Sequence, residues 1–194
     1  MDYTIKIGGE AGQGIQTIGE TLARVFSRTG HHVFSHQDYE SRIRGGHNFY
    51  QIRLSDRPIS ASRDNVDILV ALDRESILQH ERELAERGRI IYDSSSLKLK
   101  YEKPAFLDIP FADLAIESGG ERIMANTVAI GAVLSMLGME LTHFLISLPL
   151  PSGKKAMRWS WRTRARRSQA TNSPSGIAGD VSSPPGLSLL SPGC

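Results

Sequence analysis

A charged loop, Asp38-Tyr39-Glu40-Ser41-Arg42-Ile43-Arg44-Gly45-Gly46-His47-Asn48, concentrates residue types that can orient an anionic ligand. An arginine guanidinium can bind a carboxylate or a phosphate through two hydrogen bonds, and paired glycines let the backbone come close to a ligand. His47 is able to carry a proton, but a histidine beside a strand also serves as a structural hydrogen-bonding residue. Glu40 with Arg42 or Arg44 is equally consistent with a surface ion pair. The loop is therefore a candidate site with a structural alternative.

A glycine-rich turn, Gly8-Gly9-Glu10-Ala11-Gly12-Gln13-Gly14, is the second candidate. Backbone N–H groups at the start of a helix attract anions, and Gly12, Gly14 and the N–H of Ile15 are placed to offer such a site. The structural alternative is a tight strand-to-helix turn that only glycine permits.

The glycine spacing disfavours two common nucleotide sites. No Lys-Ser or Lys-Thr follows the glycines, so the turn is not a nucleoside-triphosphate P-loop. The G-x-G-x-x-G fingerprint also fails, because Thr17 replaces the third glycine counted from Gly12 and Ala11 replaces the second counted from Gly9. An ordinary nicotinamide dehydrogenase is therefore disfavoured, although Asp38 comes near the expected acidic position.

Alternating strand and helix patterns position these two segments. Ile15, Ile18, Leu22 and Phe26 recur at helical spacing, and Gly30 can form the left-handed cap that ends the helix. We expect strands at residues 3–7, 32–35, 48–54, 67–73 and 89–93 and a short edge strand at 105–110. Further helices are expected at 75–87, capped by Gly88, and at 121–137. This order predicts an α/β fold, a Rossmann-like three-layer sandwich with a mostly parallel sheet.

Composition limits the cofactors and the location. The 194 residues fit one soluble domain with an appendage, and the single cysteine, Cys194, allows no internal disulfide, CxxC pair or thiolate-ligated metal cluster. The N-terminus lacks a basic leader and an apolar signal segment, so we expect a cytoplasmic protein. Residues 128–150 carry one charge, Glu140, but are interrupted by Gly138 and Pro149. Two short buried helices joined at Gly138-Met139 explain them better than a membrane span does.

The last part of the chain has a different composition. From residue 151 onward it holds seven Lys or Arg residues, one acidic residue and both tryptophans, and it is rich in Ser, Pro and Gly. We expect a domain at residues 1–148 followed by a disordered basic tail at 149–194. Basic residues with interleaved aromatics can bind nucleic acid, but an unstructured solvated tail is the favoured interpretation.

Residues 1–148 resemble the gamma domain of the 2-oxoacid:ferredoxin oxidoreductases, which in many members is the N-terminal part of the alpha subunit. The resemblance lies in three segments: Ile7–Gly14, Gln37–Arg53 and Asn126–Ala132. The middle segment is the most specific. The opening departs from the GGxGGQG type, because Glu10-Ala11-Gly12 intervenes, a variant associated with the alpha-subunit branch.

The resemblance implies a share in the coenzyme A-dependent oxidative decarboxylation of a 2-oxoacid such as pyruvate or 2-oxoglutarate, with electrons passed to ferredoxin. It places Ser41 and Arg44 as catalytic residues near the substrate and the thiamine diphosphate, with Ser41 hydrogen-bonding and Arg44 orienting an anion or the loop itself. It also implies a domain face that meets coenzyme A or the pyrimidine-binding domain. The cofactor-binding residues on this basis are Gly9, Gly12, Gln13, Gly14, Gly45, Gly46, Asn48 and Asn126. No metal ligand is expected.

Much of the family's machinery lies outside these residues. The thiamine pyrimidine-binding domain should follow the gamma domain, and the iron–sulfur clusters and the pyrophosphate-binding domain belong to other chains such as the beta subunit. We therefore expect a component that is inactive alone. The compositional change near Leu148 leads to the hypothesis that the chain is truncated or out of frame from about Pro149. The alternative function is a stand-alone nucleotide- or coenzyme A-binding module with a basic interaction tail.

Overall fold

The computed structural model describes residues 1–39, 46–118, 120–121 and 124–139. The elements in chain order are β1 (Asp2–Glu10), α1 (Ile15–Arg28), β2 (His32–Tyr39), β3 (His47–Ser55), β4 (Val66–Ala71), α2 (Arg74–His80), the 3₁₀ helix η1 (Glu81–Glu83), β5 (Leu84–Tyr92), α3 (Ser94–Leu97), β6 (Phe106–Asp108), α4 (Phe111–Glu117) and α5 (Ala125–Met136). They form one sheet of six strands in the order β2-β3-β1-β4-β5-β6. Strands β1, β4, β5 and β6 pair in parallel, while β3 is antiparallel to both β1 and β2. The predicted α/β class and mostly parallel sheet are confirmed, and β3 makes the sheet mixed.

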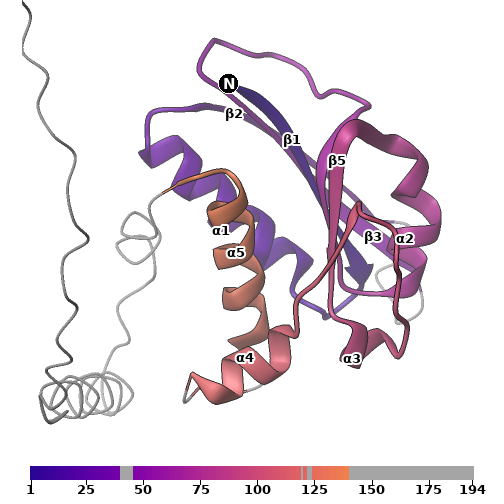
Figure 1. The fold of residues 1–194 in the computed structure, drawn as a ribbon. Coiled ribbons are helices and arrows are strands. Elements are labelled where there is room, and N and C mark those ends of the chain that lie inside the picture. The colour runs from indigo at the N-terminus through magenta and orange to yellow at the C-terminus, as the bar shows by residue number, and fades with distance from the viewer. Residues whose placement is uncertain (40–45, 119, 122–123, 140–194) are drawn as a thin grey trace, which may run out of the picture. The chain divides into compact units, whose positions relative to one another are not determined.

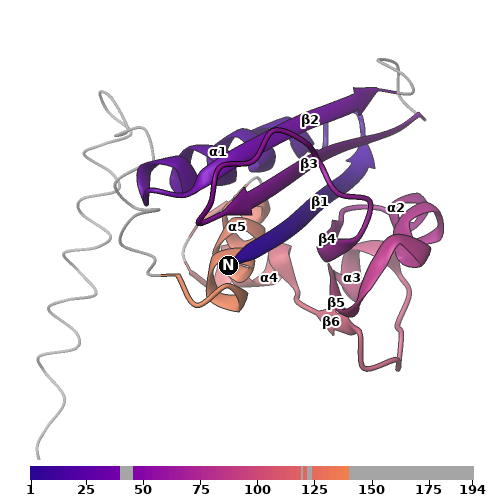
Figure 2. The ribbon, with the colours of Figure 1, turned by 90° about the horizontal axis from the view of Figure 1, so that it is seen from above.

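Helices pack on both faces of this sheet (Figures 1 and 2), with α1, α4 and α5 on one side and α2 and α3 on the other. The larger apolar cluster joins α1 and α5 to one face of β1, β3 and β4, and a smaller cluster covers the other face of β4, β5 and β6. Alternate residues of β4 enter different clusters, since Ile68 and Val70 face α1 while Leu69 and Ala71 face α2. A strand buried on both faces reads as a continuous apolar run, as the sequence predicted.

The first helix follows the predicted pattern closely. Its buried residues include Ile15, Ile18, Leu22 and Phe26, and Gly30, two residues after its end, has a φ of 87°. That left-handed conformation is the one that the sequence analysis assigned to Gly30, and it is accessible to glycine without a steric penalty.

The helix predicted at 75–87 is wrong in its second half. Helix α2 ends at His80, and β5 begins at Leu84 and contains Gly88, so Gly88 caps no helix. The register between β4 and β5 shifts between the pairs Val66–Leu84 and Ile68–Arg89, which adds an irregular segment to the strand. The charged residues there have good helix propensity, but parallel pairing with β4 overrides this local preference.

The last helix and two short helices also differ from the prediction. Helix α5 begins at Ala125 instead of residue 121, and α3 and α4 were not predicted. Among the described residues, no helix is long and apolar enough to cross a membrane. The predicted domain boundary at 148, the second helix after Gly138 and the tail lie outside the described residues and remain predictions.

Candidate functional site

A cleft lies at the carboxyl ends of the parallel strands β1, β4 and β5. Its volume is about 200 Å³, and it is lined by Gln13, Ala71, Leu72, Asp93, Ser96, Leu97, Phe111, Ala125 and Asn126. Helix α1 leaves β1 on one face of the sheet, whereas α2 leaves β4 on the other face. Open α/β sheets bind their ligands where the helices diverge in this way, outside the carboxyl ends of the strands. The cleft is therefore the candidate site.

The glycine turn forms one wall of this cleft and is held by side-chain amides. Gln13 Oε1 accepts a hydrogen bond of 2.8 Å from the Glu10 N–H, and Gln13 Nε2 lies 3.4 Å from the Leu72 carbonyl oxygen. Asn126 at the start of α5 donates from Nδ2 to the Gln13 carbonyl oxygen at 3.1 Å. These bonds join β1, β4 and α5 through residues 113 positions apart in the chain. The predicted residues Gln13 and Asn126 are thus brought together.

Three glycines of the turn are required, each for a different structural reason. Gly14 has a φ of 87°, and a Cβ added to it would lie 2.0 Å from Asn126 Nδ2. A Cβ at Gly9 would lie 2.5 Å from Gln13 Oε1, whereas Gly12, with a φ of 93°, has no atom within 4 Å of its Cβ position. The glycines at 9 and 14 therefore make room for Gln13 and Asn126, and Gly12 is required only by its backbone conformation.

The cleft offers amide and apolar contacts instead of cationic ones. Gln13 and Asn126 supply amides, and Leu72, Leu97 and Phe111 supply apolar surface. Among the described residues that line it, the one charged side chain is Asp93, whose carboxylate caps α3 by accepting bonds of 3.0 Å from the Ser96 N–H and the Ser96 hydroxyl. Since no Lys or Arg is among these nine described lining residues, the cleft suits an uncharged chain better than a phosphate group.

The charged loop is described only at its end. Ser41, Arg44 and Gly45 lie outside the described residues, so their predicted roles stay predictions. Gly46 directly precedes β3, where Asn48 pairs with Gly9 and His47 pairs with Glu10. The antiparallel register therefore brings the end of the loop beside the glycine turn, with the side chains of His47 and Asn48 on opposite faces of the sheet.

A buried charged cluster occupies the α2 side of β1 and β3. Lys6 is 5% exposed and pairs with Glu83, His80 Nδ1 lies 2.9 Å from the other Glu83 oxygen, and His80 Nε2 lies 2.8 Å from His47 Nε2. The Lys6 ammonium also lies 4.4 Å from the centre of the Phe49 ring. Burial lowers the pKa of His80 below its ordinary value, and although the hydrogen bond with Glu83 opposes this effect, the pKa stays lowered overall. Burial tends to raise the pKa of Glu83, but the hydrogen bonds from Lys6 and His80 lower it overall.

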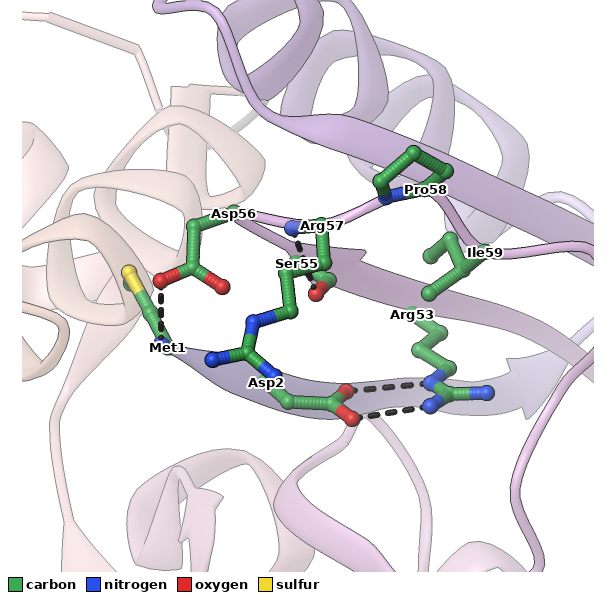
Figure 3. Close-up of a pocket in the computed structure, with 8 residues that line it drawn as sticks. All are labelled: Met1, Asp2, Arg53, Ser55, Asp56, Arg57, Pro58 and Ile59. Atoms are coloured by element: carbon green, nitrogen blue, oxygen red, sulfur yellow. Dashed lines mark hydrogen bonds and ion pairs between the residues drawn. The ribbon is translucent and has the colours of Figure 1, made fainter.

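A second hollow, of about 370 Å³, lies at the opposite end of β1 (Figure 3). It holds none of the predicted site residues. Four of its charged groups form two pairs, since the Asp2 carboxylate accepts bonds from Arg53 and the Met1 ammonium bonds to Asp56. These pairs are partly exposed, and they fasten the start of β1 to the end of β3. We assign no ligand to this hollow.

The sequence analysis missed the acidic caps and the buried cluster. Asp73 and Asp93 each follow a buried strand and cap the next helix through the serine three positions later. This Asp-x-x-Ser spacing after an apolar run is a recognisable signal for a helix start. Asp73 Oδ2 is buried and has no hydrogen-bond partner among the described residues. Lys6 gave no such signal, because its polar type in an alternating strand predicts a solvent-facing position.

Comparison with protein families matches residues 4–169 to the family described as pyruvate ferredoxin/flavodoxin oxidoreductase. The 2-oxoglutarate synthase subunit KorC of Archaeoglobus fulgidus is 31% identical over 140 residues, which cover 72% of this chain and 73% of that protein. The match to the family includes the glycine turn, the charged loop and the start of α5.

Solved structures share the fold. The gamma subunit of the keto/oxoacid ferredoxin oxidoreductase from Geobacter sulfurreducens superposes with a TM-score of 0.67 at 23% identity, over 88% of this chain and 98% of that one. The 2-oxoglutarate:ferredoxin oxidoreductase from Magnetococcus marinus with 2-oxoglutarate, coenzyme A and succinyl-CoA bound superposes with a TM-score of 0.69 at 21% identity. The superposition covers 95% of this chain and 33% of the chain from Magnetococcus marinus.

Proposed function

The chain belongs to the pyruvate ferredoxin/flavodoxin oxidoreductase family, as a gamma-type domain of a 2-oxoacid:ferredoxin oxidoreductase, and from this premise we propose that its cleft receives part of coenzyme A. In the assembled enzyme the chain would contribute to the coenzyme A-dependent oxidative decarboxylation of a 2-oxoacid, with electrons passed to ferredoxin. The observation that carries this proposal is the amide-lined cleft at the carboxyl edge of the sheet, where two of the family's sequence segments meet.

The chemistry of the cleft fits the pantetheine arm of coenzyme A better than the phosphates. That arm is uncharged and contains two amides, which match the amide side chains of Gln13 and Asn126, while its methylene groups match Leu72, Leu97 and Phe111. Coenzyme A supplies the thiol that takes over the acyl group. The role of these residues is to bind and orient the arm and to exclude water around it.

The described residues do not form an iron–sulfur site. Among the described residues, no group of three His, Cys, Asp or Glu side chains is arranged to hold a metal ion. The sequence holds one cysteine, too few for a thiolate-ligated cluster. We propose that a beta subunit and a pyrimidine-binding domain supply the thiamine diphosphate and iron–sulfur sites.

The end of the charged loop is proposed to approach the same cofactor. Asn48 and Gly46 lie next to the glycine turn through the pairing of β3 with β1, which supports their assignment beside the cofactor. Ser41 and Arg44 remain proposed catalytic residues, with Ser41 hydrogen-bonding and Arg44 orienting the anionic substrate or the loop. Gly45 is proposed to let the backbone approach the ligand.

The test is co-expression with a beta subunit and a pyrimidine-binding domain of the family, followed by an assay of viologen reduction that depends on both 2-oxoacid and coenzyme A. An Ala125→Trp variant places a large ring in the cleft, and Leu78→Trp, on the exposed surface of α2, is the matched control. We expect Ala125→Trp to raise the KM for coenzyme A by about tenfold, while the KM for the 2-oxoacid is unchanged.

Two outcomes would contradict parts of this proposal. If Ala125→Trp and Leu78→Trp give active complexes with the same KM for coenzyme A, coenzyme A does not bind in the cleft. A chain that binds coenzyme A but reduces no viologen even with a beta subunit and a pyrimidine-binding domain present would favour the stand-alone binding module.

A further inference from the structure

Three buried side chains and the partly exposed Glu83 form a continuous chain from η1 to the first residue of β3. Glu83 contacts Lys6 through one carboxylate oxygen and His80 Nδ1 through the other, and His80 Nε2 reaches His47 Nε2. His80 and His47 are 5% and 7% exposed. The cleft and the glycine turn involve none of these contacts, and the proposed function assigns them no role.

The contact between the two rings fixes how many protons they carry. Two nitrogens 2.8 Å apart are bridged by one proton, which one ring donates and the other accepts. An ionised carboxylate only accepts, so Glu83 requires the N–H of His80 to be on Nδ1. His80 Nε2 is then the acceptor, and His47 is the donor. A first added proton leaves this bridge intact, whereas a second places a proton on both facing nitrogens and breaks it.

We propose that Glu83 and His80 are positioning residues that hold His47, and through it the start of β3, by a single bridging proton. His47 directly follows Gly46, the last residue of the charged loop's paired glycines, and it pairs with Glu10 at the end of β1. The bridge therefore ties the point where the loop enters the sheet to the end of α2. Its strength depends on proton uptake by the pair.

Charged groups from each neighbouring element favour the singly bridged state. Lys6 on β1 places a cation 3.4 Å from His80 Nδ1 and opposes a second proton on the His80 ring, while Glu83 on η1 keeps the Nδ1 proton in place. On α2, the hydroxyl of Ser76 lies next to the Gly8 backbone beside His47 and is bonded to Asp73. Across the sheet, the His36 ring of β2 lies 5.8 Å from the Phe49 ring, which separates it from the pair.

The direct test is the nitrogen NMR spectrum of the histidine rings in the full chain. We expect His80 as the Nδ1–H tautomer and His47 as the Nε2–H tautomer at pH 7.5. In Glu83→Gln the single amide oxygen should turn to the Lys6 ammonium and leave the NH₂ group facing His80, which reverses both tautomers. Glu81→Gln is the matched control, because Glu81 lies on the same 3₁₀ helix but pairs with Lys103 at the surface, and it should leave both rings unchanged.

Hydrogen exchange measures the effect on β3. His80→Phe removes the bridge, and we expect about tenfold lower protection of the backbone amides between His47 and Phe49. His36→Phe on β2 makes the same replacement outside the pair and should leave that protection within about twofold of the unchanged chain. In the unchanged chain, this protection should decrease as the pH falls and the second proton enters the pair. His80→Phe should lack this pH dependence.

The inference is overturned if His80 carries its proton on Nε2 in the unchanged chain. It is also overturned if the β3 amides are equally protected from exchange in His80→Phe and His36→Phe. The tautomer measurement needs no substitution, so it decides the matter even if a variant fails to fold. None of these readouts uses enzymatic activity, and they therefore stand apart from the proposed function.

Discussion

At the end of β1, the two faces of the sheet are stabilised by different kinds of interaction. On the α1 face, the glycine turn and Asn126 are held by backbone conformation and uncharged amides. On the α2 face, the buried Lys6 ammonium pairs with the partly exposed Glu83 carboxylate, and two buried histidines bond to each other beside this ion pair. Backbone conformation and amide hydrogen bonds therefore stabilise the first face. Ion pairing and hydrogen bonding between residues far apart in the sequence stabilise the second. This difference predicts which substitutions each face tolerates.

The largest effect should come from Gly14→Ala on the α1 face. Alanine at a φ of 87° is strained, and its Cβ would displace the Asn126 amide that lies 2.0 Å away. We expect a loss of about 3 kcal/mol in the free energy of unfolding, from the backbone strain and the lost hydrogen bond together. Urea denaturation followed by circular dichroism measures this change.

Gly12→Ala is the control for the backbone contribution. Its φ is 93°, but its Cβ position is open, so we expect a loss of only about 1 kcal/mol. Combining Gly14→Ala with Asn126→Ala should cost less than the sum of the two single changes, since the clash is then absent. Equal losses at Gly12 and Gly14 would show that Asn126 does not constrain the turn.

The next effect is expected on the α2 face, from Lys6→Met. Methionine keeps the apolar stem over Phe49 but leaves the Glu83 carboxylate without its cation. Loss of one partner of a fully buried pair costs about 3–5 kcal/mol, and because the Glu83 side chain is 35% exposed we expect about 2 kcal/mol here. Adding Glu83→Gln should recover part of this loss in the same denaturation experiment. A Lys6→Met variant as stable as the unchanged chain would show that the ion pair does not stabilise this face.

Acid should weaken the α2 face before the α1 face. The pKa of His80 is lowered in the fold, so as the pH falls below the ordinary value of 6.5 the unfolded chain takes up the proton first and stability declines. The pKa of Glu83 is also lowered, so a further loss begins as the pH falls through its ordinary value of 4.5 and continues to the lowered one. Urea midpoints measured between pH 8 and pH 4 should show the first decline, and His80→Phe should flatten it. A slope that persists in His80→Phe would assign it to another group.

The two faces also differ in how far the sequence predicts them. The glycines, the helical spacing from Ile15 to Phe26 and the cap at Gly30 are local signals, and the structure follows them. Gln13 and Asn126 were connected only through the family resemblance, because 113 positions separate the bonded pair. Lys6 and Glu83 lie 77 positions apart, and Glu83 was expected inside a helix that ends earlier. A buried pair of this kind depends on strand order, which no local pattern encodes.

The smallest effect should come from Glu81→Gln, which compares a surface ion pair with the buried one two positions away. Glu81 bonds to Lys103, whose side chain is 65% exposed, so water screens the pair and can replace either partner. We expect a change below about 0.5 kcal/mol in the free energy of unfolding, against the larger loss from breaking the pair at Glu83. The same carboxylate-to-amide change would then have two different costs within one 3₁₀ helix. Because both glutamate side chains are 35% exposed, the difference isolates the burial of the partner lysine as the cause. Similar costs at Glu81 and Glu83 would mean that the α2 face gains its stability from packing instead of from its charges.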